Sequence, residues 1–127
     1  MKMKNKKVLI VDDEAGFCRT VSAYLKARKF VTYEALNGIH ALKAIDKVLP
    51  DLILLDVVMP EMDGYELLKK LKETPRYSKI PVIMLTVKSL PEDLGRGIDL
   101  QSDFYLPKPV SMENLMNFIS LIFAHPC

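Results

Sequence analysis

Long hydrophobic runs, closely spaced cysteines and a strong excess of charge of either sign are all missing from this sequence of 127 residues. The apolar segments, such as Val8–Val11, are too short for a membrane span or for the core of a signal peptide, so we expect a cytoplasmic protein. The formal net charge of +2 does not indicate binding to nucleic acid or to a membrane. The basic residues within Met1–Lys7 are interpreted as a solvated terminus rather than a binding arm.

Cysteine and histidine are scarce, and neither has the spacing of a metal or redox site. Cys18 and Cys127 lie far apart in the sequence and are predicted to be free thiols in a reducing cytosol. His40 and His125 are isolated, which favours surface or packing roles over metal ligation. Internal repeats, low-complexity tracts and linkers are also missing, so residues 1–127 are expected to form a single domain.

The sequence does contain a repeated pattern in which short apolar runs alternate with amphipathic stretches. Hydrophobic residues make up 50% of the chain and charged residues 27%, a balance that favours a folded core over disorder. The first, third and fourth runs lack the polar alternation of a half-exposed strand, as is typical of strands buried on both faces of a parallel sheet. The runs that predict strands are Val8–Val11, Val31–Ala35, Leu52–Leu55, Pro81–Leu85 and Phe104–Leu106.

Apolar residues at helical spacing between these runs predict the helices. The fourth of five expected helices would begin near Ser89 and be short or mobile, because Gly95 and Gly97 each lower helix propensity by roughly 1 kcal/mol relative to alanine. Ser111 is expected to cap the last helix. Five strands alternating with five helices imply a parallel sheet covered on both faces. The stripes are Phe17, Val21, Leu25 and the amphipathic Arg28; Ala41, Ile45, Val48 and Leu49; Leu67, Leu68 and Leu71; and Leu115, Phe118, Ile119 and Ile122.

Acidic side chains follow two of the predicted strands at the point where each strand ends. Asp12, Asp13 and Glu14 follow the first run, and Asp56 follows the third. In an open α/β sheet ligands bind beyond the carboxyl ends of the strands, so we expect these acids to converge. Clustered carboxylates repel one another unless a cation neutralises them, and oxygen ligands of this kind suit Mg²⁺. Any one aspartate could instead cap a helix or form a turn, but that alternative explains three converging acids poorly.

A hydroxyl and an ammonium group are expected at the same edge of the sheet. Thr86 ends the fourth run, and Lys108 with Pro109 follows the fifth. Both polar groups can contact a phosphoryl oxygen, so together with the acids and a metal they predict a site where a carboxylate attacks phosphorus. Each is a weak signal alone, since threonine is common at strand ends and lysine is usually solvated. Their order along the chain makes the combination specific.

The motifs around these residues resemble those of response-regulator receiver domains. The resemblance covers residues from about Lys7 to Phe123, and the segment Asp56–Gly64 is nearly diagnostic by itself. It implies a flavodoxin-like, doubly wound α/β fold in which five parallel strands have the order 2-1-3-4-5 and are accompanied by five helices. The motifs read VLIVDDE at 8–14, LLDVVMPEMDGYELL at 54–68, IPVIMLT at 80–86 and FYLPKP at 104–109.

The resemblance implies that Asp56 accepts a phosphoryl group with the help of Mg²⁺. Asp13 and Asp56 would bind the metal directly, together with the backbone carbonyl of Val58. Asp12 would act mainly through a bound water. Lys108 would pair with Asp56 before phosphorylation and with the phosphoryl group afterwards.

The same resemblance assigns further residues to a conformational switch. Thr86 would donate its hydroxyl to the phosphoryl group, and Tyr105 would turn inward when Thr86 moves. Pro109 would direct Lys108 into the site through a cis peptide bond, which proline permits at modest cost. The residues alone leave a second interpretation of Tyr105 open, as a half-buried aromatic residue of a strand.

The resemblance also implies the partners. A histidine kinase or a histidine phosphotransfer protein would donate the phosphoryl group, and the face of the fourth helix, fifth strand and fifth helix would signal to a downstream protein, a fused output domain or a second copy of the chain. Met112, Met116 and Phe123 form a second apolar stripe on the last helix, which indicates either core packing or such a contact surface. The domain would catalyse only its own phosphorylation and dephosphorylation.

Two other functions remain open at this point. A Mg²⁺-dependent phosphohydrolase with an aspartyl nucleophile shares the carboxylate chemistry, but usually carries two aspartates in one motif after its first strand and a larger capping segment. A receiver-like module that only binds partners would need no phosphorylation chemistry. The presence of the acids, of Thr86 and of Lys108 argues against that inert module.

Overall fold

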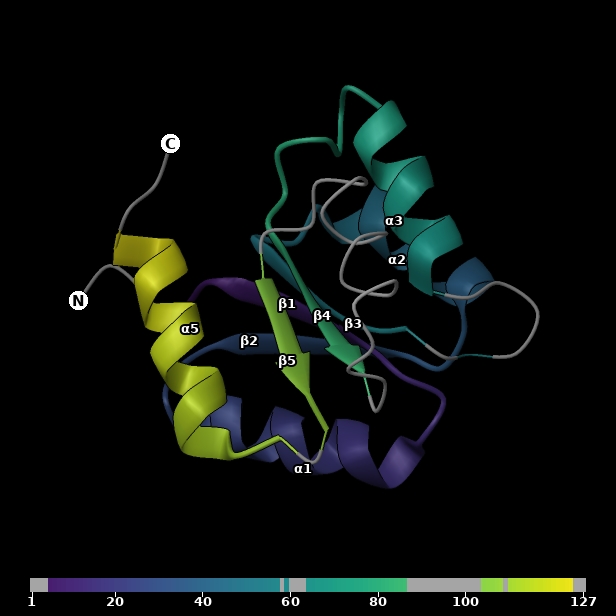
Figure 1. The fold of residues 1–127 in the computed structure, drawn as a ribbon. Helices are drawn as coiled ribbons and strands as arrows, with labels where there is room; N and C mark the ends of the chain where they lie inside the picture. The colour runs from purple at the N-terminus through teal and green to yellow at the C-terminus, as the bar shows by residue number, and fades with distance from the viewer. Residues whose placement is uncertain (1–4, 58, 60–63, 87–103, 109, 125–127) are drawn as a thin grey trace.

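A five-stranded parallel sheet forms the centre of the computed structural model, which describes residues 5–57, 59, 64–86, 104–108 and 110–124 (Figure 1). The strands lie in the order β2-β1-β3-β4-β5, and every neighbouring pair is parallel. Both the five predicted strands and the expected strand order are therefore confirmed. The strand bounds are β1 Lys7–Val11, β2 Val31–Ala35, β3 Leu52–Asp56, β4 Val82–Thr86 and β5 Phe104–Pro107.

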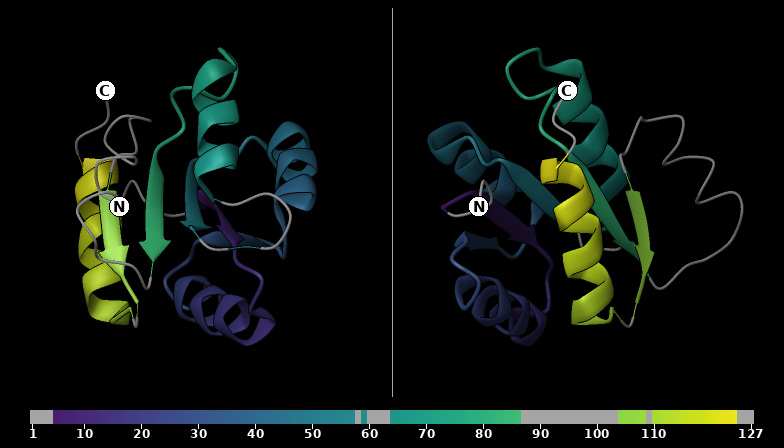
Figure 2. Two further views of the ribbon diagram at one scale, coloured as in Figure 1. Left: turned by 45° about the vertical axis from the view of Figure 1, so that its right-hand side comes forward. Right: turned by 90° about the vertical axis from the view of Figure 1, so that its left-hand side faces the viewer.

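The sheet is covered by helices on both faces. Helices α1 and α5 lie on one face, and α2 and α3 lie on the other, as Figures 1 and 2 show. The expected fourth helix falls within 87–103, outside the described residues. No helix in the described part of the chain combines the length and apolar character needed to cross a membrane. The helix bounds are α1 Ala15–Lys26, α2 Gly38–Val48, α3 Gly64–Glu73 and α5 Met112–Ala124.

Strand β3 shows why its sequence lacks polar alternation. Ile53 and Leu55 pack into the hydrophobic cluster beneath α2 and α3, which we call the α2/α3 cluster. Leu52 and Leu54 pack into the cluster beneath α1 and α5, the α1/α5 cluster. Every residue of β3 is buried, and burying each such aliphatic side chain contributes about 1.5–3 kcal/mol. Asp56 is thus the last residue of a strand that is otherwise entirely apolar.

The ends of the helices follow from local hydrogen bonding. The side chain of Asn37 accepts a hydrogen bond from the backbone N–H of His40 at 2.8 Å and begins α2. Ser111 accepts one from the backbone N–H of Asn114 at 3.2 Å and caps α5, as predicted.

Two residues assigned to the predicted stripes lie outside the helices, so those assignments were wrong. Leu49 follows α2 with a left-handed φ of 52° and is 38% exposed, because the chain turns there toward β3. Arg28 follows α1, and its guanidinium lies over the ring of Tyr24 at 3.5 Å from the centroid. In both stripes the helical spacing of the side chains continues past the end of the helix, but the helical backbone conformation does not.

Removing the cap of α2 should destabilise the domain measurably. The Asn37→Ala substitution leaves a first-turn N–H without its side-chain acceptor, and we expect a loss of about 1 kcal/mol in the free energy of unfolding. Urea unfolding followed by circular dichroism measures the loss. Asn37→Asp is the matched control, since it keeps an acceptor at the same position and should stay close to the parent. Equal losses in both variants would contradict the capping role.

Candidate functional site

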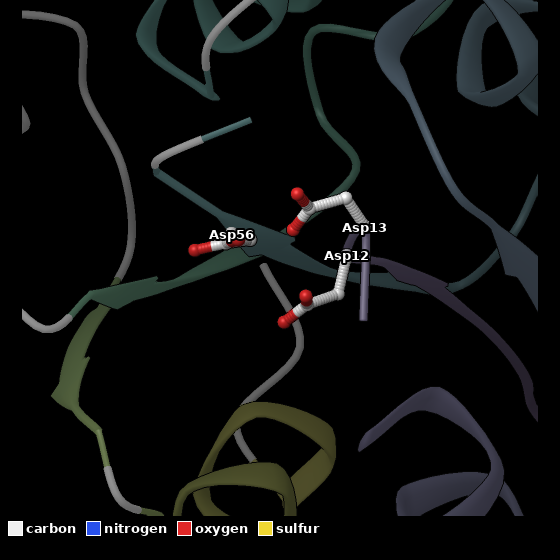
Figure 3. A group of neighbouring side chains, drawn as sticks. All are labelled: Asp12, Asp13 and Asp56. Carbon is white, nitrogen blue, oxygen red and sulfur yellow. The ribbon is translucent and has the colours of Figure 1, made fainter. Parts of the chain in front are cut away.

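Three carboxylates come together at the carboxyl edge of the sheet (Figure 3). Asp12 and Asp13 follow β1, and Asp56 ends the neighbouring strand β3. One oxygen from each lies within 4.8 Å of the others. Asp12 is 0% and Asp56 5% exposed, whereas Asp13 is open to solvent. The predicted convergence is therefore confirmed, and it concentrates negative charge where little water screens it.

The backbone holds Asp12 and Asp56 in place. The N–H of Asp12 donates to the carbonyl of Ala35 at 3.0 Å, which extends the pairing of β1 with β2 by one bond. One carboxylate oxygen of Asp12 accepts the N–H of Glu14 at 2.9 Å, as in a local turn. Beyond Asp56, the N–H of Val57 donates to the carbonyl of Leu85 at 2.9 Å. The turn-forming alternative for Asp12 is thus correct for one of its oxygens, while the other faces the site.

Lys108, the residue that follows β5, brings the opposite charge to the site. Its ammonium donates a hydrogen bond to Asp12 Oδ2 at 2.5 Å and lies 3.8 Å from Asp56 Oδ1. Glu14 Oε1 lies 3.5 Å away at the solvent side. The expected contact with Asp56 is present, but it is the longer of the two contacts with buried carboxylates, because the ammonium lies closer to Asp12.

The charge of Lys108 is maintained by its partners. Burial alone lowers the pKa of this ammonium, but the hydrogen bond to Asp12 and the charges of Asp12, Asp56 and Glu14 raise it by more. The net result is a pKa above the ordinary value for lysine, so Lys108 is positively charged at neutral pH. One ammonium beside three carboxylates leaves an excess of negative charge. A set of carboxylate oxygens with this excess fits a hard divalent cation such as Mg²⁺.

The aromatic ring of Phe17 lies against the ammonium of Lys108. Lys108 Nζ lies 4.5 Å from the centroid of the Phe17 ring, in the first turn of α1. A cation over an aromatic face is attracted by the electron density of the ring. Phe17 was expected in the apolar stripe of the first helix, and its contact with Lys108 was not predicted, since helical spacing carries no information about a lysine that follows a distant strand.

Gly64 brings the start of α3 against the acceptor strand. Its N–H donates to the carbonyl of Val57 at 2.8 Å. A Cβ at this position would lie 2.3 Å from the backbone oxygen of Asp56 and 2.8 Å from the Cα of Val57. Glycine is required here by close approach. Gly64 ends the segment Asp56–Gly64 that carries the family resemblance, but the sequence did not predict that this glycine lies against Asp56.

Tyrosine hydroxyls join α3 to β5. Tyr65, the second residue of α3, is 2% exposed, and its hydroxyl lies 2.5 Å from that of Tyr105. Tyr105 is half-buried and packs against the α2/α3 cluster. This burial agrees with the interpretation of Tyr105 as a half-buried strand aromatic, and its role as a switch stays a prediction. Tyr65 was missed because nothing in its local sequence distinguishes it from a core residue.

Other residues predicted for the site are described only in part. Thr86 is the last residue of β4 and pairs in register with Pro107, but its side chain lies outside the described part of the structure. Val58 and Pro109 lie entirely outside the described residues. Their assigned roles stay predictions.

Cys18 is a free thiol, as predicted, and the structure shows that it is buried next to Asp12. Its sulfur donates to the backbone carbonyl of Asp12 at 3.4 Å. Burial raises the pKa of this thiol to about 12, and the negative charges of Asp12 and Glu34 add to the effect. Cys18 therefore acts as a packing residue. His40 is exposed, in agreement with the surface role expected for it, whereas Cys127 and His125 lie outside the described residues.

This arrangement coincides with a match to a known family. The family model described as the response regulator receiver domain matches residues 8–120. The chain belongs to this family. The three clustered aspartates and Lys108 of this receiver domain thus lie within the matched region, together with all five strands except the first residue of β1.

Individual relatives support the same assignment. The receiver domain superposes on the chemotaxis protein CheY4 of Vibrio cholerae with a TM-score of 0.88 at 31% identity, covering 93% of this chain and 98% of that one. The receiver domain of response regulator 1452 from Francisella gives a TM-score of 0.86 at 31% identity, with coverages of 94% and 98%. The "Probable transcriptional regulator ycf29" of Pyropia yezoensis is 37% identical over 118 residues, 93% of this chain and 53% of that protein. The chain spans about half the length of the first curated relatives it matches.

Adding one methyl group at Gly64 should disturb the site. In Gly64→Ala the new Cβ would collide with the backbone of Asp56 and Val57, so α3 must shift. We expect a loss of about 1–3 kcal/mol in the free energy of unfolding, measured with urea. Gly16→Ala is the control, since a Cβ at Gly16 in α1 meets nothing within 4 Å and should be neutral or slightly stabilising. Unchanged stability of Gly64→Ala would contradict the close approach.

The ring of Phe17 and the ammonium of Lys108 should stabilise each other. A double-mutant cycle of Phe17→Leu and Lys108→Met is expected to give a coupling energy of about 0.5–2 kcal/mol, as for other cations over aromatic rings. Urea unfolding of the parent, the single variants and the double variant supplies the four values. A second cycle that pairs Phe17→Leu with Lys43→Met, at an exposed lysine of α2, should show no coupling. The contact is refuted if both cycles give the same result.

Proposed function

We propose that this receiver domain accepts a phosphoryl group on Asp56, in a Mg²⁺-dependent reaction, from the phosphohistidine of a histidine kinase or a histidine phosphotransfer protein in the cytoplasm. The observation that carries the proposal is the convergence of Asp12, Asp13 and Asp56 with Lys108 at one edge of the sheet. Membership of the receiver family supports it further.

Asp56 is the proposed nucleophile. A carboxylate oxygen attacks phosphorus while the P–N bond to the donor imidazole breaks, which yields an acyl phosphate and a free imidazole. Asp13, Asp56 and the backbone carbonyl of Val58 would hold Mg²⁺, with Asp12 acting through a bound water. When bound, the metal offsets the negative charge of the transferred group. The 5% exposure of Asp56 keeps bulk water away from the attacking oxygen.

Lys108 is proposed to change partners during the reaction. Its ammonium already contacts both buried carboxylates, at 2.5 Å from Asp12 and 3.8 Å from Asp56. A phosphoryl group on Asp56 carries more negative charge than the carboxylate it replaces and so competes for the ammonium. Only a small displacement of Nζ is needed, because the charge that attracts it appears next to Asp56. The ring of Phe17 would limit the directions in which the ammonium can move.

The conformational readout is proposed to follow from Thr86 and Tyr105. Thr86 would move toward the phosphoryl group, Tyr105 would turn inward, and Pro109 would keep Lys108 directed into the site. The output face would comprise β5, α5 and the expected fourth helix. This biases an equilibrium between two conformations that exist before phosphorylation.

The recipient of the signal is proposed to be a downstream protein or a fused output domain. The relative from Pyropia yezoensis is named as a transcriptional regulator, and this chain spans 53% of it. On α5, Met112, Met116 and Phe123 are half-buried against the α1/α5 cluster. Core packing therefore accounts for much of this stripe, and its remaining exposed surface would be available to a partner.

The proposal is tested by the intact mass of the protein after incubation with Mg²⁺ and acetyl phosphate. The parent should gain one phosphoryl group, while Asp56→Asn, or the parent without Mg²⁺, should gain none. Glu73→Gln is the control, because it removes one exposed acidic charge at the end of α3 and leaves the site intact. It should be labelled like the parent.

Other outcomes identify the alternatives. If the parent is not labelled, titration with beryllofluoride and Mg²⁺ tests whether the site binds a phosphoryl analogue at all. Absence of both labelling and binding would refute the proposal in favour of an inert interaction module. Sustained hydrolysis of free phosphate esters would refute it in favour of an aspartyl phosphohydrolase.

A further inference from the structure

The hydroxyl pair of Tyr65 and Tyr105 links two elements that are far apart in the sequence. Tyr65 lies in the first turn of α3, and Tyr105 lies on β5, in register with Met84 of β4. Their oxygens are 2.5 Å apart. A buried phenol needs a partner for its hydroxyl, and Tyr65 is 2% exposed. The interaction therefore favours the orientation of Tyr105 in which its hydroxyl is directed at α3.

The position of Tyr65 depends in turn on the strand that ends in Asp56. Its preceding residue, Gly64, donates to the carbonyl of Val57 at 2.8 Å. Gly64 also lies so close to the Asp56 backbone that a methyl group would not fit between them. The first turn of α3 is thus fixed to the backbone of Asp56–Val57. A shift of that backbone is transmitted to the Tyr65 hydroxyl through one peptide unit and one rigid side chain.

The position of Tyr105 connects the pair to the other side of the site. Tyr105 precedes Lys108 by three positions on the same chain segment, and Lys108 contacts both Asp12 and Asp56. The hydroxyl pair therefore joins the segment that carries the nucleophile to the segment that carries the ammonium. It does so on the face covered by α2 and α3, where the ring of Tyr105 packs.

We propose that Tyr65 is a positioning residue, whose hydroxyl holds Tyr105 in the orientation directed at α3, which is here the inward one, and thereby couples the orientation of Tyr105 to the state of Asp56. This route runs through Gly64 and α3, in addition to the route through Thr86. The inference rests on the proposed function, because it assumes that a phosphoryl group on Asp56 favours the inward orientation of Tyr105.

The coupling has a measurable consequence at the site itself. A contact that stabilises the inward orientation also strengthens binding of any ligand that favours this orientation, because coupling between two sites is reciprocal. Losing one neutral hydrogen bond should therefore weaken the binding of beryllofluoride by about two- to tenfold. The effect is expected even though neither hydroxyl touches the ligand site.

The experiment is a cycle of Tyr65→Phe, Tyr105→Phe and the double variant, each of which removes only oxygen atoms. Beryllofluoride is titrated in the presence of Mg²⁺, and the tyrosine ring resonances of ¹³C-labelled protein are followed by NMR. We expect each single variant to bind about two- to tenfold more weakly, with no further loss in the double variant. In Tyr65→Phe the ring resonances of Tyr105 should shift before any ligand is added.

Tyr77→Phe is the matched control for stability. The Tyr77 hydroxyl donates to Asp46 at 2.6 Å, away from the site, so its loss should lower the free energy of unfolding without changing the affinity for beryllofluoride. Should Tyr65→Phe fail to fold, Tyr105→Phe tests the same pair from the less buried side.

The outcomes separate this inference from the proposed function. If the parent is neither labelled by acetyl phosphate nor able to bind beryllofluoride, both are overturned; if it is labelled but does not bind beryllofluoride, the inference alone is overturned. If the parent binds it and Tyr65→Phe binds it equally well, or if the two single losses add in the double variant, the inference alone is overturned. Weaker binding in both single variants, without additivity, supports it.

Discussion

The geometry of this receiver domain depends on one ammonium group placed between two buried carboxylates. Asp12 follows β1 and Asp56 ends the adjacent strand β3, and both strands pack apolar side chains on both faces, so the two charges lie at the boundary of the core. Without Lys108 the two acids would repel each other in a poorly solvated place. The lysine relieves part of this repulsion and leaves enough negative charge to attract a divalent cation. The site therefore combines the attraction between Lys108 and its partners with the repulsion among the carboxylates.

Much of the fold could be predicted because it depends on features that are local in the sequence. Apolar runs such as Leu52–Leu55 predicted strands correctly, since burial on both faces removes the need for alternation. The convergence of Asp12 and Asp56 was also predictable, because parallel strands place their carboxyl ends at the same edge. The errors at Arg28 and Leu49 arose where the apolar spacing continues past the point at which the backbone leaves the helix.

The contacts between distant side chains could not be predicted in the same way. The placement of Lys108 over Phe17, its closer approach to Asp12 than to Asp56, and the pairing of Tyr65 with Tyr105 all depend on side-chain directions across separate elements. Periodicity reports which face of an element is buried, but not which neighbour its polar end meets.

The buried thiol of Cys18 has a consequence for the durability of the site under oxidation. The thiol is fully enclosed and donates to the backbone of Asp12, and with a pKa raised to about 12 it remains protonated in neutral solution. Peroxides and disulfides react with thiolates rather than with protonated thiols. The Cys18 thiol, which hydrogen-bonds the backbone of Asp12, is therefore expected to resist oxidants that modify exposed, low-pKa cysteines. The backbone that holds Asp12 at this edge of the sheet is thereby protected from thiol oxidation at that position.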